Sequence, residues 1–167
     1  MGRVFQPARN PGAGVAAPSI ISGAYTTGQT FKKGAVLVQT AAGTLSEAGA
    51  DPSADIAGVA LEGAGTKPGY DMANSDQILQ VTGRVQEVSY AKAKSGTVFS
   101  GRGINGGTDP VTPAQTNIHE QYGIAKTAAG EWVIDLAEVT TKSIEIVDID
   151  IEQKIFFFVF IESVLAA

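Results

Sequence analysis

The chain has 167 residues, enough for one domain that buries about 70% of the surface its unfolded form would expose. It contains no cysteine, which excludes disulfide bonds and thiolate metal sites. Its formal net charge is −5, a balance that argues against nucleic-acid binding. Because glycine is abundant and charged residues are sparse, we expect an all-β fold, a compact β-barrel or sandwich of short antiparallel strands.

The first 18 residues predict an extended N-terminal arm, followed by a single β domain at residues 19–167. Three prolines fix the backbone of this segment and remove hydrogen-bond donors, and the segment has no strand or helix period. We expect such an arm either to be disordered or to be ordered by a partner. Its basic and apolar side chains are therefore candidate partner contacts, namely Arg3, Val4, Phe5 and Arg9.

Beyond the arm, apolar runs separated by turn residues predict a series of strands. The expected strands span residues 20–26, 35–40, 44–47, 56–62, 77–81, 84–90, 97–100, 122–127, 132–136, 143–152 and 155–163. Residues 90–95 are compatible with one helical turn, and residues 101–113 predict a loop.

Residues 101–106 match the pattern G-x-G-x-x-G and follow an expected strand. A dinucleotide site would require a helix that begins there, so that its amides meet the pyrophosphate. Pro110 and Pro113 are incompatible with that helix, and we interpret the segment as a surface loop.

His119 is the single histidine of the chain. One imidazole cannot form a histidine metal cluster, and no nucleophile-elbow sequence accompanies it. We therefore expect no catalytic residue, no metal and no cofactor, and we do not expect an enzyme.

Acidic residues gather toward the C-terminus, whereas none precedes Glu47. Opposite charge at the two ends favours head-to-tail contact between copies, or an arm that lies on its own domain. Asp148, Asp150 and Glu152 alternate with isoleucines, which places three carboxylates on one face of a strand. They could bind a hard cation such as calcium, receive the basic arm of a neighbouring copy, or face solvent.

Residues 155–161 are apolar at every position, so alternation fails in this strand. A strand covered on one face would alternate apolar and polar residues. We therefore expect both faces to be covered, either inside a sandwich or by the core on one side and another subunit on the other. Phe156, Phe158 and Phe160 are the candidate contacts, and the roughly 20 apolar residues of a membrane span are lacking.

A pattern of glycine-spaced turns runs from about residue 30 to residue 137. It consists of FKKGAVL at 31–37, a hairpin at 40–45, DIAGVAL at 55–61, TGRV at 82–85, YGIAK at 122–126 and GEWVIDL at 130–136. This pattern resembles the small β-rich head decoration, or cement, proteins of tailed bacteriophages.

The resemblance implies a structural virion protein, made in the bacterial host cytoplasm, that binds the major capsid protein on the outer capsid surface. It implies self-association, with a homotrimer favoured over a dimer, and no catalytic residues. The alternatives are a tail or fibre module, a hydrolase and a carbohydrate-binding β-domain. For the last of these, Trp132 and Tyr122 are the candidate sugar platform, although both lie in expected strands.

Overall fold

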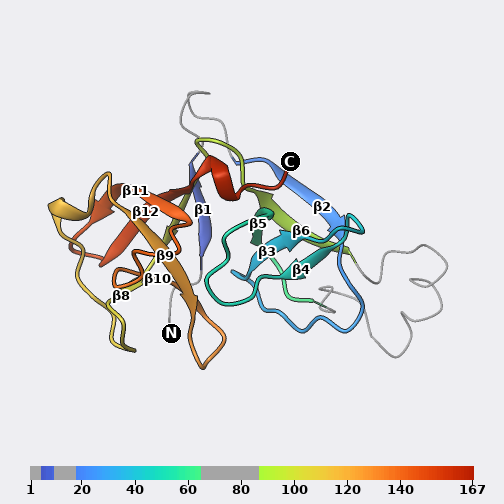
Figure 1. Ribbon diagram of the computed structural model, residues 1–167, viewed down its shortest axis with the longest axis horizontal. Coiled ribbons are helices and arrows are strands. Elements are labelled where there is room, and N and C mark those ends of the chain that lie inside the picture. Colours follow the sequence, from blue (N-terminus) through green and yellow to red (C-terminus); the bar gives the residue numbers. More distant parts are fainter. Residues whose placement is uncertain (1–4, 10–17, 65–86) are drawn as a thin grey trace.

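The computed structural model of the chain describes residues 5–9, 18–64 and 87–167 (Figure 1). Two sheets pack together, and the predicted all-β fold is confirmed in its sandwich form. The larger sheet contains, in order, β1 (Gln6–Arg9), β7 (Val98–Gly101), β12 (Ile155–Phe160), β11 (Ile144–Asp150), β9 (Gln121–Lys126), β10 (Trp132–Asp135) and β8 (Gly103–Ile104). The smaller sheet contains β2 (Ile20–Ala24), β6 (Glu87–Lys92), β5 (Ile56–Ala60), β3 (Val36–Gln39) and β4 (Leu45–Glu47). Short 3-10 helices occur at Gln115–Asn117 (η2) and Glu162–Val164 (η3).

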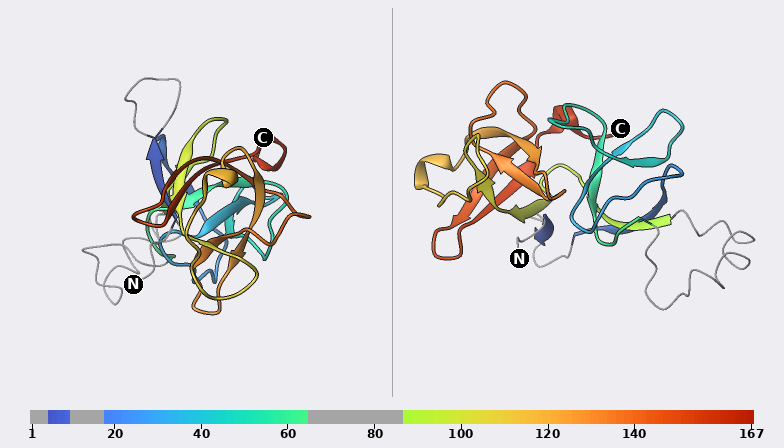
Figure 2. Two further views of the ribbon diagram at one scale, coloured as in Figure 1. Left: turned by 90° about the vertical axis from the view of Figure 1, so that its left-hand side faces the viewer. Right: turned by 90° about the horizontal axis from the view of Figure 1, so that it is seen from below.

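The two sheets lie at opposite ends of the long axis and meet in the middle (Figures 1 and 2). One hydrophobic core runs through both of them, with buried residues from both sheets. The C-terminal segment returns from β12 in the larger sheet to β5 in the smaller one, where Leu165 forms a bridge with Ile56. The amide of Ala166 donates to the carbonyl oxygen of Ile56 at 2.9 Å, so the chain end joins the two sheets.

The larger sheet curls strongly. Strands β7 and β8 are separated only by Arg102, yet they pair with different neighbours in the sheet order. The carbonyl oxygen of Arg102 accepts a hydrogen bond from the amide of Ile134 at 2.9 Å. Two glycines make this tight packing feasible, because a Cβ at Gly101 would lie 2.5 Å from the Phe5 ring and one at Gly103 would lie 2.7 Å from the Phe156 ring.

Residues 5–9 belong to the domain, which differs from the expectation of a separate arm. Strand β1 pairs antiparallel with β7, so that Gln6 lies opposite Ser100. Phe5 is 1% exposed, and its ring centroid lies 4.9 Å from that of Phe158. The prediction that Phe5 contacts a partner is therefore corrected, since the core of its own chain covers it. Arg9 ends β1, whereas Arg3 and Val4 lie outside the described residues.

Most expected strands are present with shorter bounds. Strand β6 continues to Lys92, so the helical turn considered at residues 90–95 is absent. The glycine-rich segment begins as strand, since Gly101 ends β7 and Gly103 starts β8, and only the residues after Ile104 form the expected loop. The strand expected at 77–81 and the turn at 82–85 lie outside the described residues.

A single carboxylate links the two sheets. Glu47 of β4 accepts a hydrogen bond from the indole Nε1 of Trp132 at 3.0 Å and one from Lys126 Nζ at 2.7 Å. Trp132 is 1% exposed, so Glu47 provides the acceptor for a donor that water cannot reach. Lys126 is the more exposed partner, at 37% of its side chain.

Replacing Phe5 with alanine should destabilise the domain by about 3–5 kcal/mol, because removing a buried aromatic ring leaves a cavity in the core. Gln6→Ala, an exposed change in the same strand, is the matched control and should alter stability by about 0.5 kcal/mol or less. Urea unfolding of both variants measures the difference. Equal stability of the two would contradict the placement of Phe5 in the core.

Replacing Glu47 with alanine should cost about 1–3 kcal/mol, because the buried indole N–H of Trp132 loses its acceptor. Lys126→Ala removes only the exposed partner and should cost about 1 kcal/mol or less. Thermal and urea unfolding of the two variants give the comparison. An equal loss of stability in the two variants would show that the ion pair, and not the indole bond, links the sheets, because Glu47→Ala removes both interactions.

Candidate functional site

The phenylalanines of β12 form the centre of the larger sheet's core. Phe156, Phe158 and Phe160 are 0%, 0% and 2% exposed. Phe99 of β7 packs on two of them, with ring centroids 6.0 Å from Phe158 and 5.3 Å from Phe160. The prediction that these three side chains contact a partner is corrected, because β12 is an inner strand and its own domain covers this face.

The opposite face of β12 is different, because it also carries apolar side chains but leaves them half-buried. Phe157 and Val159 alternate with the core phenylalanines and are not part of the core. In register, Phe157 lies between Asp148 of β11 and Ser100 of β7, and Val159 lies beside Glu145 of β11. The outer face of the larger sheet therefore has two apolar side chains flanked by carboxylates.

Not all of the acidic residues that were expected on one face of a strand lie in β11. Asp148 and Asp150 lie in the strand after a bulge, whereas Glu152 lies in the following turn. Asp150 Oδ1 accepts from the amide of Gln153 at 2.9 Å, so this carboxylate stabilises the turn. In the described ranges, no three acidic or histidine side chains gather to hold a metal ion. The cation site considered at Asp148, Asp150 and Glu152 thus finds no support in their positions.

The remaining motifs have structural roles. Gly101 and Gly103 give space to two phenylalanine rings, and no helix follows them in the described segment 101–113. His119 is exposed, with Nδ1 3.7 Å from a carboxylate oxygen of Glu145. The imidazole of His119 therefore lies at the surface beside one carboxylate.

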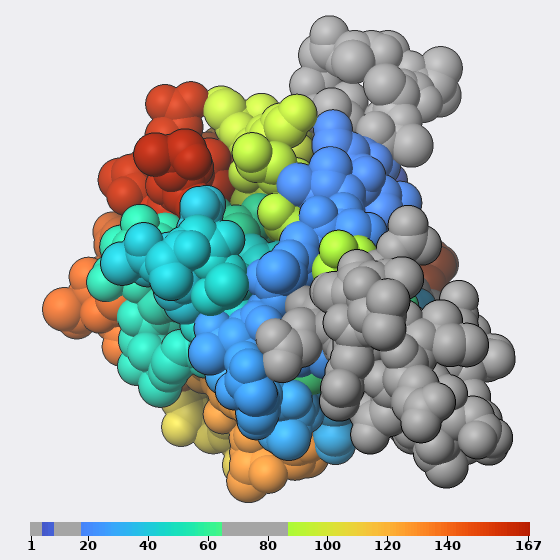
Figure 3. All heavy atoms as spheres, turned by 90° about the vertical axis from the view of Figure 1, so that its right-hand side faces the viewer, coloured from blue at the N-terminus to red at the C-terminus, as the bar shows by residue number. Residues whose placement is uncertain are grey.

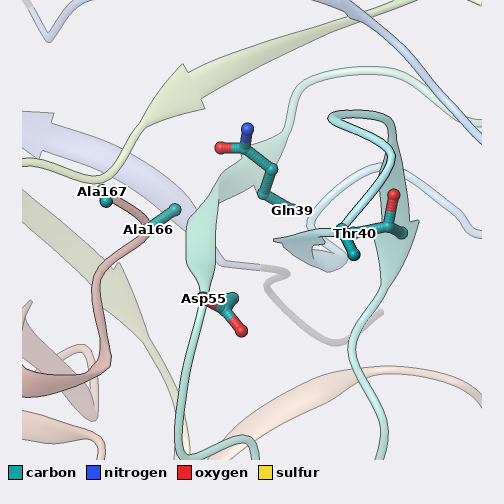
Figure 4. A pocket seen from close by; sticks show the side chains of 6 residues that line it. Gln39, Thr40, Asp55, Ala166 and Ala167 are labelled. Carbon is teal, nitrogen blue, oxygen red and sulfur yellow. The ribbon is translucent and has the colours of Figure 1, made fainter.

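A shallow hollow of about 380 Å³ lies where the C-terminal segment meets the smaller sheet (Figure 4). It is lined by Gln39, Thr40, Ala41, Asp55, Ala166 and Ala167. Asp55 supplies its one ionisable side chain.

The proposed sugar platform is not available on the surface. Trp132 is buried and donates to Glu47, as described above. Tyr122 is half-buried, and its hydroxyl accepts a hydrogen bond from Asn117 Nδ2 at 3.1 Å. Neither ring lies open for stacking on a sugar.

Comparisons with models of protein families, with curated proteins and with solved structures found no match for this chain. No helix in the described part of the chain is long and apolar enough to cross a membrane. The surfaces of the molecule are therefore what indicates its function.

The sequence predicted the apolar strand β12, but the three phenylalanines that it offered as contacts face the core. The sequence did indicate that Phe157 and Val159 are unusual, because apolar residues at every position of β12 place apolar side chains on both of its faces. It could not show which face belongs to the core, because the register with β7 and β11 decides that. The exposed isoleucines of β2, Ile20 and Ile21, had no distinguishing pattern and were missed.

Proposed function

We propose that this chain is a non-enzymatic structural protein that binds the outer surface of a tailed-bacteriophage capsid, where the major capsid protein is its partner. The resemblance of residues 30–137 to head decoration proteins suggests the partner. The all-β fold is compatible with it, and so is the lack, among the described residues, of an acidic or histidine cluster that could hold a metal ion.

The outer face of β12 is the observation that carries the proposal. A sheet face in contact with water should carry polar residues at alternate positions, yet Phe157 and Val159 occupy them. Aromatic and apolar side chains on an accessible face are typical of a contact surface for another macromolecule. The neighbouring carboxylates of Glu145 and Asp148 would favour a basic patch on that partner.

Attachment through a small surface is sufficient on a capsid. Each copy contributes a modest contact, but identical sites repeat across the shell. If copies are also linked to one another, the second attachment becomes intramolecular and the overall affinity rises. A tail or fibre module remains the alternative, because it would use the same kind of surface on a different part of the particle.

The test is co-sedimentation of the purified protein with expanded, DNA-free heads and with whole particles of the phage whose genome encodes it, followed by antibody labelling in the electron microscope. We expect the protein on the heads. Labelling confined to tails would favour the alternative, and absence from the particles would overturn both.

Replacing Phe157 with aspartate should weaken head binding at least about tenfold, because it puts a charge at the centre of the apolar contact. Val139→Asp places the same charge on an exposed loop valine and should leave binding unchanged. Circular dichroism and urea unfolding establish that both variants are folded. If Phe157→Asp is folded and binds heads like the unaltered protein, the outer face of β12 is not the contact.

A further inference from the structure

Strand β2 is an outer strand of the smaller sheet and has unusual exposure for an apolar strand. It contains Ile20, which is 61% exposed, and Ile21, which is 38% exposed. It has no charged residue and no proline over Ile20–Ala24. The segment that includes β2 lies at the molecular surface, at the end of the molecule that the smaller sheet forms (blue in Figure 3).

The other outer strands of the described sheets are protected against pairing with a further chain. Strand β1 contains Pro7 and a bulge after it, and β8 has two residues. Strand β4 has three residues, and the carbonyl oxygen of Leu45 already accepts from the amide of Thr26 at 2.8 Å. Prolines, bulges, short length and cover are the usual means by which edges avoid adding a strand. Within residues 18–64 and 87–167, strand β2 has none of these features, apart from the bridge of Tyr25 to Leu45 just beyond its end.

Among the described residues, alternate residues of β2 point their backbone N–H and C=O groups away from β6 and toward no other strand. The amide of Lys92 in β6 donates to the carbonyl oxygen of Ser19 at 2.9 Å, so Ser19 points its hydrogen-bonding groups at β6. In an antiparallel pair these directions alternate, which turns Ile21 and Gly23 toward β6 and Ile20 and Ser22 away from it. The outward N–H and C=O groups of Ile20 and Ser22 are the ones that an added strand would bind.

We infer that β2 pairs antiparallel with β2 of a second copy, across a two-fold axis at Ile21. This register joins the outward groups of Ile20 to those of Ser22 in the other copy. It places the two Ile21 side chains opposite each other as an apolar cross-strand pair. It also keeps the contact clear of the end of β2 that Tyr25 and Leu45 already occupy.

Charge favours the second copy as the occupant. The Ser19 end of β2 is basic, because Lys94 Nζ lies 3.5 Å from Ser19 Oγ and Lys92 is adjacent in β6. The Ala24 end is acidic, because Ala24 pairs with Glu87. Antiparallel pairing brings the basic end of each copy to the acidic end of the other, which parallel pairing would not do.

This contact gives a dimer, the alternative to the trimer favoured by the resemblance. It lies on the smaller sheet, whereas the proposed capsid contact lies on the larger one, so it does not depend on the proposed function. It can be tested on the purified full chain without any capsid.

The test is sedimentation equilibrium of the unaltered protein and of variants at Ile21. We expect a concentration-dependent dimer for the unaltered protein. Ile21→Lys and Ile21→Glu should each raise the dissociation constant at least about tenfold, because like charges then face each other at the axis. An equimolar mixture of the two variants should form dimers again, since lysine then faces glutamate.

Two further variants serve as controls. Val139→Lys makes the same apolar-to-lysine change on an exposed loop and should leave the dimer intact. Ser22→Pro removes an outward N–H that β6 does not use, so it should abolish the dimer while the domain remains folded. A monomeric or trimeric unaltered protein would overturn the inference. So would a dimer that survives Ile21→Lys, or a mixture of the two Ile21 variants that stays monomeric.

Discussion

The packing of Phe5 against Phe158 is the contact on which the larger sheet depends. It joins the first described residue to the C-terminal strand, across a glycine whose missing side chain leaves space for the ring. Phe158 in turn contacts Phe160 edge-on, with centroids 5.5 Å apart, and Phe99 lies beside both. Strands from the beginning, middle and end of the sequence therefore become stable together, as a cooperative unit.

The smaller sheet depends on this unit through a few specific links. The core continues from one sheet to the other, and Leu165 extends it as the chain returns to Ile56. Glu47 fixes the orientation of the two sheets, because the buried indole N–H of Trp132 donates to this one carboxylate of β4. Apolar contact alone would allow one sheet to slide on the other, whereas a buried donor with one acceptor permits a single arrangement.

The sequence predicted the strands well, because local alternation and turn residues determine them. Strand β12 was identified by its apolar run, and the hairpin of β9 and β10 by its glycine turn. Strand β1 was missed because four residues containing a proline have no period, and only pairing with β7 makes them a strand. Pairing between distant segments, here β12 with β7, also decides that Phe156 faces the core and Phe157 the outside. No local sequence pattern shows this.

The two proposed contacts fit together because they use different sheets. The capsid contact uses Phe157 on the outer face of an inner strand, where side chains provide the surface. The contact between copies uses Ile21 on an outer strand, where backbone groups provide it. Since neither contact covers the other's strand, one copy can make both at once. A dimer then presents two capsid-binding faces, and a contact too weak to hold one copy can hold a pair when two sites on the shell match their spacing.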